Sequence, residues 1–324
     1  MTLTQGQALS IIGMTKRTVA SAASAVSAAS AVSAVSAANA VSVASAVSAA
    51  SEGARRHDPP GAFTVHHDGV TIPVTRGGRG RPLVFCPGLN STQAGLHELA
   101  ELLRRDYDVV TFDLRGHGPA SAADRYGFDA FLSDLVAVLA ELDLPTAPVL
   151  VGYSLGADLA VHCAAQCAHA VAGLVLIDGA NPLPEPFITE ADLAEFRAMA
   201  HDLATQQAAE RVKSTAHQVS LTAQNIFDLN LEIDVVRSAI LDQYRRIDHP
   251  ITMIMSTSIA GDSLEGRAPR HNQLWQAGIE RLVRERPHVS TSWITADHRL
   301  VFTHAQDIAE IIRSTFRPAG SATF

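Results

Sequence analysis

From residue 61 onward, short apolar runs alternate with segments whose apolar residues have helical spacing. Two strands joined through a helix run parallel, so this alternation is typical of a mostly parallel sheet with helices on both faces. A hairpin around Asp68-Gly69 precedes the alternation. The expected strands are 62–67, 70–75, 83–86, 109–113, 149–153, 172–178, 251–256 and 290–294, and the expected helices are 93–105, 128–142, 155–169, 273–285 and 305–316. We therefore assign the chain to the α/β class.

The alternation stops between residues 184 and 248. This stretch contains amphipathic helical segments at 190–209 and 233–246 but no strand pattern. In parallel α/β folds, ligands bind at the carboxyl edge of the strands. We therefore expect residues 184–248 to form a helical cap over that edge, and residues 61–183 and 249–324 to form the core.

Residues 1–60 have a different composition. Small polar residues stand at every third position from 21 to 51, with Ala and Val between them. Because an α-helix turns about 100° per residue, a period of three builds no single apolar face. We expect a low-complexity, disordered segment and a linker. Lys16 and Arg17 before this stretch are similar to a signal peptide, but the stretch lacks Leu, Ile and Phe. We favour a cytoplasmic over a secreted protein and expect no membrane span.

Composition excludes several classes of partner. The formal net charge of −8 disfavours nucleic acid, which usually requires a basic face. The three cysteines, Cys86, Cys163 and Cys167, have neither the number of a disulfide framework nor the spacing of a zinc site. We interpret them as small buried hydrophobic residues in a reducing compartment. The expected partner is a small-molecule substrate, with no cofactor and no metal; the sequence does not predict an oligomeric state.

The pentapeptide Gly152-Tyr153-Ser154-Leu155-Gly156 lies between an apolar strand and an alanine-rich helix. A serine on such a sharp strand-to-helix turn needs flanking residues without side chains, because other parts of the chain approach closely. The turn exposes the hydroxyl, and the helix directs its N-terminal amides toward the same place. This pattern predicts that Ser154 is a nucleophile. An ordinary turn with a capping serine is the alternative.

With this elbow, the chain resembles the α/β-hydrolase superfamily from residue 62 to residue 317. The segment Asp113-Leu114-Arg115-Gly116-His117-Gly118 is similar to the D-x-R-G-x-G motif after the family's fourth strand. Asp297-His298, followed by a final helix, is similar to the family's terminal histidine loop. The resemblance implies the α/β-hydrolase fold, an eight-stranded, mostly parallel sheet with helices on both faces and a helical cap insertion.

The resemblance also assigns roles to residues. The backbone amides of Leu155, after the nucleophile, and Leu89, after the third strand, would form the oxyanion hole. His298 would be the general base because it directly follows the last strand. His304, at the start of the final helix, is the less favoured base, and His117 is expected to be a structural loop residue.

The triad acid is defined less clearly. Family members usually place it after the seventh strand, where this chain has Asp262, with Glu265 as a less favoured substitute in the same loop. Other members place it after the sixth strand, where this chain has Asp178. We favour Asp262 and keep Asp178 as the alternative. Asp297 is set aside because it cannot easily orient the imidazole of its own neighbour.

These roles together imply acyl transfer to water through an acyl-enzyme on Ser154, without a cofactor. The expected substrate is a carboxylic ester, lactone or thioester of small to medium size. Carbon–carbon bond hydrolysis and cofactor-free perhydrolysis are alternatives on the same triad. A non-catalytic small-molecule receptor on the same fold is the alternative from a different functional class.

Overall fold

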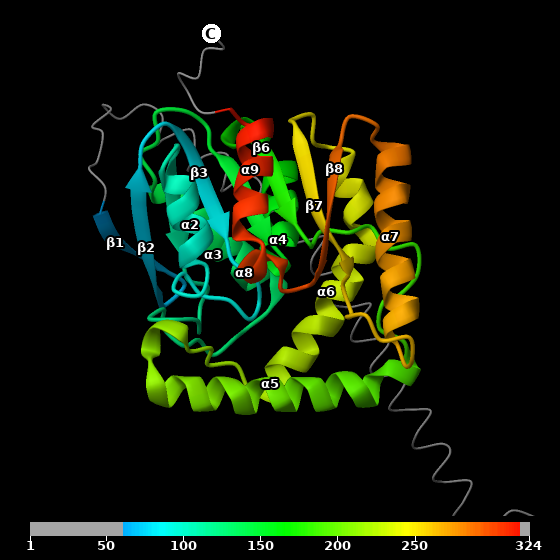
Figure 1. Ribbon diagram of the computed structural model, residues 1–324. Coiled ribbons are helices and arrows are strands. Elements are labelled where there is room, and N and C mark those ends of the chain that lie inside the picture. Colours follow the sequence, from blue (N-terminus) through cyan, green and yellow to red (C-terminus); the bar gives the residue numbers. More distant parts are fainter. Residues whose placement is uncertain (1–60, 318–324) are drawn as a thin grey trace, which may run out of the picture. The chain divides into compact units, whose positions relative to one another are not determined.

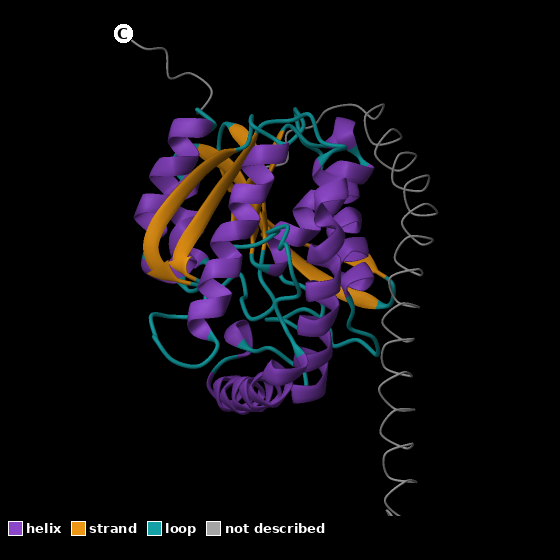
Figure 2. Cartoon of the chain, turned by 90° about the vertical axis from the view of Figure 1, so that its right-hand side faces the viewer, coloured by secondary structure: helices purple, strands orange, loops and turns teal. Residues whose placement is uncertain are grey.

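The computed structural model describes residues 61–317. This part of the chain contains one eight-stranded sheet with helices on both of its faces (Figures 1 and 2). The low-complexity segment predicted for residues 1–60 lies outside the described residues and stays a prediction. Between residues 61 and 317, no helix combines the length and the apolar character that crossing a bilayer requires.

The strand order in the sheet is β1-β2-β4-β3-β5-β6-β7-β8. The strands are β1 (Gly61–His67), β2 (Val70–Gly78), β3 (Arg81–Cys86), β4 (Tyr107–Phe112), β5 (Val149–Tyr153), β6 (Gly173–Ile177), β7 (Ile251–Ser258) and β8 (Ser290–Asp297). β2 runs antiparallel to both β1 and β4, and every other neighbouring pair is parallel. The predicted mostly parallel α/β sheet is confirmed.

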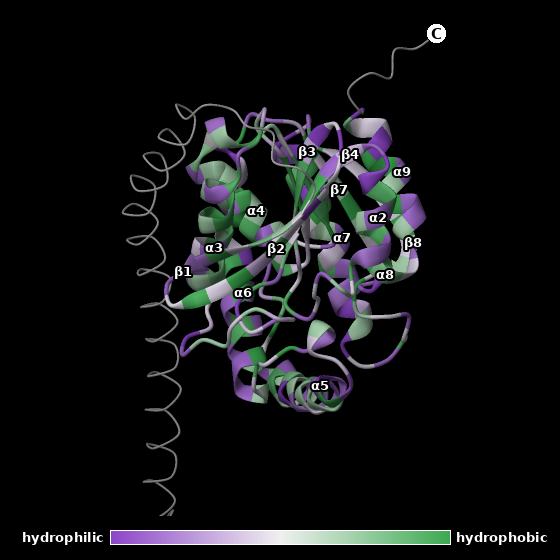
Figure 3. Cartoon of the chain, turned by 90° about the vertical axis from the view of Figure 1, so that its left-hand side faces the viewer, coloured by the Kyte–Doolittle hydropathy of each residue, from purple (hydrophilic) through white to green (hydrophobic). Residues whose placement is uncertain are grey.

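The central strands are buried on both faces. Every residue of β4, β5 and β6 is buried, as expected for continuous apolar runs in a parallel sheet between two helical layers. Successive side chains point to opposite faces, so Leu83 and Phe85 pack into one apolar cluster while Val84 and Cys86 pack into the other. In Figure 3, the central strands are predominantly hydrophobic. The edge strand β8 is largely exposed.

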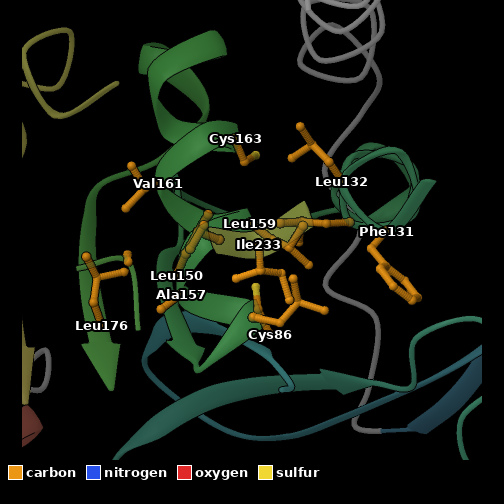
Figure 4. Close-up of a cluster of buried hydrophobic side chains, with 14 of the residues drawn as sticks. Cys86, Phe131, Leu132, Leu150, Ala157, Leu159, Val161, Cys163, Leu176 and Ile233 are labelled. Carbon is orange, nitrogen blue, oxygen red and sulfur yellow. The ribbon is translucent and has the colours of Figure 1, made fainter. Parts of the chain in front are cut away.

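Two layers of helices cover the sheet. The described helices are α2 (His97–Arg104), α3 (Phe128–Glu141), α4 (Leu155–Gln166), α5 (Leu193–Lys213), α6 (Ala223–Tyr244), α7 (Ala268–Glu285), α8 (Leu300–Thr303) and α9 (Ala305–Thr315). α2, α8 and α9 pack on one face, and α3, α4, α6 and α7 contribute to the cluster on the other. Figure 4 shows part of this second cluster, in which Leu150 of β5 lies near Leu159 of α4 and Ile233 of α6.

Four helices begin at positions different from those predicted: α5 begins at Leu193 rather than at residue 190, α6 begins at Ala223 rather than at residue 233, and α2 and α7 are also shifted. α2 begins only at His97, because Gln93 is engaged elsewhere: its backbone and side-chain N–H groups donate to the two carboxylate oxygens of Asp113 at 2.8 and 2.9 Å. α7 begins earlier than predicted, at Ala268. Its second residue, Pro269, is tolerated there because the first turn of a helix has no internal use for that N–H.

The segment from 184 to 248 contributes the two long helices α5 and α6 and adds no strand to the described eight-stranded sheet. In Figure 1, α5 runs across the carboxyl ends of the strands. α6 packs against α4, where Arg237 donates three hydrogen bonds of 2.7–3.1 Å to Asp158. This arrangement supports the cap interpretation, although the division into core and cap domains stays a prediction.

The three cysteines behave as small apolar residues. Cys86, Cys163 and Cys167 are free and buried. Burial raises the pKa of each thiol, so each stays protonated and unreactive at neutral pH. The sequence-based interpretation of these residues as buried hydrophobic positions is confirmed.

Asp113 directly follows β4 and is 1% exposed. Burial raises the pKa of its carboxyl group to about 6, although hydrogen bonds from Gln93 act in the opposite direction. The ordinary pKa of the group is 3.8, so the folded state holds the proton more tightly than the unfolded state. The resulting stabilisation is complete below about pH 4 and is lost as the pH rises through about 6.

We predict that the difference in unfolding free energy between the wild type and Asp113→Asn depends on pH. Relative to the variant, the wild type should gain on the order of 2–3 kcal/mol between about pH 7 and about pH 4. Denaturant unfolding of both proteins at several pH values measures this difference. A difference that stays constant with pH would show that ionisation of Asp113 is not its cause.

Candidate active site

The nucleophile elbow joins β5 to α4. Ser154 has φ +51° and ψ −120°, a conformation that residues with a Cβ avoid. The turn is fixed to the neighbouring strand because the N–H of Ser154 donates to the carbonyl oxygen of Ile177 at 2.9 Å. A Cβ at Gly156 would overlap the carbonyl oxygen of Cys86, which explains the glycine at this position. Ser154 is half-buried rather than sealed inside the core.

His298 directly follows β8, and its Nε2 lies 3.0 Å from the Oγ of Ser154. Its side chain is 37% exposed, so solvent and small molecules can reach it. The ring of Tyr153 stacks on the imidazole with 5.2 Å between the centroids, and the hydroxyl of Tyr153 donates to the carbonyl oxygen of His298 at 2.8 Å. These two contacts fix the position of the imidazole. The structure thus brings together the two side chains that the sequence selected as nucleophile and base.

Asp178 directly follows β6, and its side chain is fully buried. Its Oδ2 lies 2.8 Å from Nδ1 of His298. The backbone N–H and the hydroxyl of Ser256, on β7, donate to this carboxylate at 2.8–2.9 Å, and the indole N–H of Trp275, on α7, donates at 2.9 Å. A buried carboxylate needs such donors because desolvation disfavours its charge. With Nδ1 of His298 donating to Asp178, Nε2 is free to accept the serine proton.

Asp262 does not lie beside the imidazole. It is exposed, and its carboxylate accepts a hydrogen bond from the hydroxyl of Ser258, at the end of β7. The preference for Asp262 over Asp178 is therefore corrected: the carboxylate that contacts His298 is that of Asp178.

The loop after β7 explains why its acidic residues are not available to the imidazole. β7 continues to residue 258, beyond its predicted end, and a turn at Gly261 (φ +82°) follows. The side chain of Asn272, on α7, bonds to the N–H of Ala260 and to the carbonyl oxygen of Gly261. Glu265, the other acidic candidate in this loop, is exposed.

The other candidates from the terminal loop have different partners. His304 lies between α8 and α9, where its Nδ1 is 2.9 Å from the hydroxyl oxygen of Thr303. Asp297 is exposed and accepts a hydrogen bond from the N–H of Arg299. The described contacts connect neither residue to Ser154.

The two residues assigned to the oxyanion hole lie in segments next to the nucleophile. Leu155 is the first residue of α4 and follows Ser154 directly. The loop after β3 passes against the same serine, because a Cβ at Gly88 would lie only 3.1 Å from the Cβ of Ser154. Leu89 follows Gly88, and Ser91 closes this loop by accepting a hydrogen bond from the Gly88 N–H at 2.7 Å. The location of these two segments supports the assignment of Leu89 and Leu155 to an oxyanion hole, which stays a proposal.

His117 supports the loop that contains Leu89. It is fully buried, and its ring nitrogens lie 2.9 Å from the carbonyl oxygen of Arg115 and 2.6 Å from that of Leu89. Burial lowers the pKa of His117, and its contacts with the backbone act in the opposite direction. The sequence indicated a structural role for His117. The sequence did not indicate that His117 contacts the loop containing Leu89, because 28 positions separate His117 from Leu89.

The arrangement as a whole can move a proton from a hydroxyl to an imidazole beside a buried carboxylate. Across residues 61–317, no group of three or more His, Cys, Asp or Glu side chains is arranged to hold a metal ion. The contacts from Ser154 through His298 to Asp178 suit the serine hydroxyl for nucleophilic attack on an electrophilic carbon.

Comparisons with known proteins agree with this geometry. The family model described as alpha/beta hydrolase fold matches residues 81–262, more than half of the chain. An N-formylmaleamate deformylase from Pseudomonas putida is 38% identical over 104 residues, which are 32% of this chain and 38% of that protein. A non-heme haloperoxidase from Rhodococcus erythropolis is 36% identical over 124 residues, which are 37% of this chain and 45% of that protein. Each alignment thus spans less than half of the relative's length.

Solved structures give the same fold. A bromoperoxidase from Bacillus anthracis matches with a TM-score of 0.63 and 18% sequence identity, covering 79% of this chain and 100% of that one. A likeness at this identity shows the fold and leaves the activity open. The match of the family model and the strand order nevertheless identify the family of this chain. The chain belongs to the α/β-hydrolase fold family.

Proposed function

We propose that this chain is a serine hydrolase that cleaves a carboxylic ester, lactone or thioester through an acyl-enzyme on Ser154. The main support is the continuous hydrogen-bonded series from the Ser154 hydroxyl through His298 to Asp178, with separations of 3.0 and 2.8 Å. An imidazole placed between a serine hydroxyl and a buried carboxylate is suited to take the serine proton near neutral pH.

In the first half-reaction, Nε2 of His298 accepts the proton as Oγ of Ser154 attacks the carbonyl carbon. The carbonyl oxygen becomes an oxyanion that accepts hydrogen bonds from the amides of Leu89 and Leu155. Each donor stabilises the transition state by on the order of 3 kcal/mol. Asp178 stabilises the imidazolium. The intermediate then collapses: the bond to the alkoxide or thiolate breaks, and the leaving group receives the proton from His298.

In the second half-reaction, water takes the place of the leaving group. His298 removes a proton from the water, whose oxygen attacks the acyl carbon, and the intermediate releases the carboxylic acid as Ser154 recovers its proton. The deformylase named above, a relative whose name describes removal of a formyl group, makes formyl compounds useful additions to a substrate panel.

A second candidate is perhydrolysis, in which hydrogen peroxide attacks the same acyl-enzyme in place of water and releases a peroxyacid. It is favoured by the relative named as a non-heme haloperoxidase. Carbon–carbon bond hydrolysis would use the same three side chains. The receptor alternative is less favoured, because binding alone does not require this proton relay.

The proposal is tested with a fluorophosphonate probe and a panel of chromogenic esters, lactones and thioesters, each with and without peroxide. We expect the wild type to be labelled at Ser154 and to hydrolyse at least one class of substrate. Ser154→Ala should show neither labelling nor turnover. Folded wild-type protein that is not labelled, yet binds panel compounds, would favour the receptor and refute the hydrolase.

A further inference from the structure

One tryptophan lies in direct contact with the carboxylate of the candidate triad. Trp275, on α7, donates its indole N–H to Oδ1 of Asp178 at 2.9 Å, while Oδ2 of the same group lies 2.8 Å from Nδ1 of His298. The two contacts therefore involve different oxygens of one carboxylate. Trp275 is 1% exposed, so a substrate does not reach it.

The indole is itself held from several sides. The guanidinium of Arg237, on α6, lies over the indole ring at 5.4 Å from its centroid, and the ring of Phe187 lies 5.9 Å away. Hydrogen bonds to Asp158 fix Arg237 in turn. The backbone carbonyl of Trp275 accepts a hydrogen bond of 2.7 Å from the side chain of Asn181. Rotation of the indole away from Asp178 would disrupt its contacts with Arg237 and Phe187.

The donors to Asp178 show what the indole adds. The hydroxyl of Ser256 lies 2.9 and 2.8 Å from the two carboxylate oxygens, so it does not distinguish between them. The backbone N–H of Ser256 and the indole N–H of Trp275 both donate to Oδ1, one from β7 and one from α7. Together they hold Oδ1 away from the imidazole and leave Oδ2 facing it.

We propose that Trp275 is a positioning residue that fixes the rotation of the Asp178 carboxylate for its contact with His298. The inference rests on the proposed function, because it presumes that this contact supports proton transfer. Trp275 acts through Asp178 and touches no reacting atom. Its contribution should therefore be seen in the chemical step and not in substrate binding.

The kinetic test compares two substitutions of the same kind at the chain's two tryptophans. Trp275→Phe keeps an aromatic ring and removes the N–H, so we expect kcat to fall about tenfold with KM unchanged, the effect of losing a hydrogen bond to a charged group. Trp293→Phe is the matched control, because Trp293 is 41% exposed on β8, and it should retain the wild-type kcat. An unchanged kcat in folded Trp275→Phe would overturn the inference.

A spectroscopic test does not depend on turnover or on the folding of Trp275→Phe. In the Trp293→Phe protein, Trp275 supplies the remaining indole N–H, so a ¹⁵N-indole spectrum should show one resonance, shifted downfield by the carboxylate. Adding Asp178→Asn should move this resonance upfield; an unmoved resonance would overturn the inference. Absence of fluorophosphonate labelling and hydrolysis in the wild type would instead refute the proposed function, and the indole resonance would still report whether Trp275 bonds to Asp178.

Discussion

Asp178→Asn will lower kcat about 10⁴-fold, whereas Asp262→Asn will keep a rate close to that of the wild type. Oδ2 of Asp178 lies 2.8 Å from Nδ1 of His298. An amide in its place would present either a neutral oxygen or an N–H to that nitrogen. The first loses the charge that stabilises the imidazolium, and the second favours the tautomer in which Nε2 cannot accept the serine proton. Asp262 is exposed, and its carboxylate accepts a hydrogen bond from Ser258. Its charge therefore neither stabilises the imidazolium nor selects the tautomer of His298.

The measurement is kcat and KM of both variants on the best substrate from the panel. Circular dichroism of each variant controls for folding, which matters because Asp178 is fully buried and accepts several hydrogen bonds. A large loss in Asp262→Asn together with a normal rate in Asp178→Asn would reverse our assignment of the acid. Normal rates in both variants would exclude either carboxylate as the triad acid.

Arg115→Met will lower the unfolding free energy by about 3–5 kcal/mol. Arg115, in the loop after β4, donates two hydrogen bonds of 2.7 Å to the two oxygens of Asp134 on α3. The side chains are 2% and 0% exposed. Removing the guanidinium leaves a buried carboxylate without its cation, and the desolvation cost of that charge is then not offset.

Denaturant unfolding of Arg115→Met gives the loss directly, and a thermal melt should show a decrease in Tm of roughly 10 °C. The matched control is the double variant Arg115→Met with Asp134→Leu, which removes both charges and should recover much of the stability. If the double variant were as unstable as the single one, the loss would come from the other contacts of Arg115, among them those with Asp68 and the carbonyl oxygen of Arg125, and not from the unpaired charge of Asp134.

The sequence was sufficient to predict the parts of the site that depend on local patterns. Ser154 is marked by glycines two residues before and after it, each needed because neighbouring backbone leaves no room for a Cβ. His298 is marked by its position after the last strand, a property that periodicity and chain order reveal. For the same reason, the eight-stranded, mostly parallel sheet followed from the alternation and from the family resemblance.

The acid could not be chosen in this way, because the choice depends on contacts between distant residues. Asp178 and Asp262 each follow a parallel strand, and both strands end at the same edge of the sheet. The two residues differ in their hydrogen-bond donors. The carboxylate of Asp178 accepts hydrogen bonds from Ser256, 78 positions away in the sequence, and from Trp275, 97 positions away. No local pattern records such a convergence. The early start of α7, which brings Asn272 to the loop after β7, was hidden for the same reason.

The backbone conformation of Ser154 affects which substitutions selection can favour at this position. A residue with a Cβ at φ +51° costs roughly 1–2 kcal/mol relative to one at an ordinary angle. Glycine would relieve that strain and remove the hydroxyl in the same step. At residue 154, thermal robustness and reactivity are therefore opposed, and selection for stability alone would drive this position toward an inert turn.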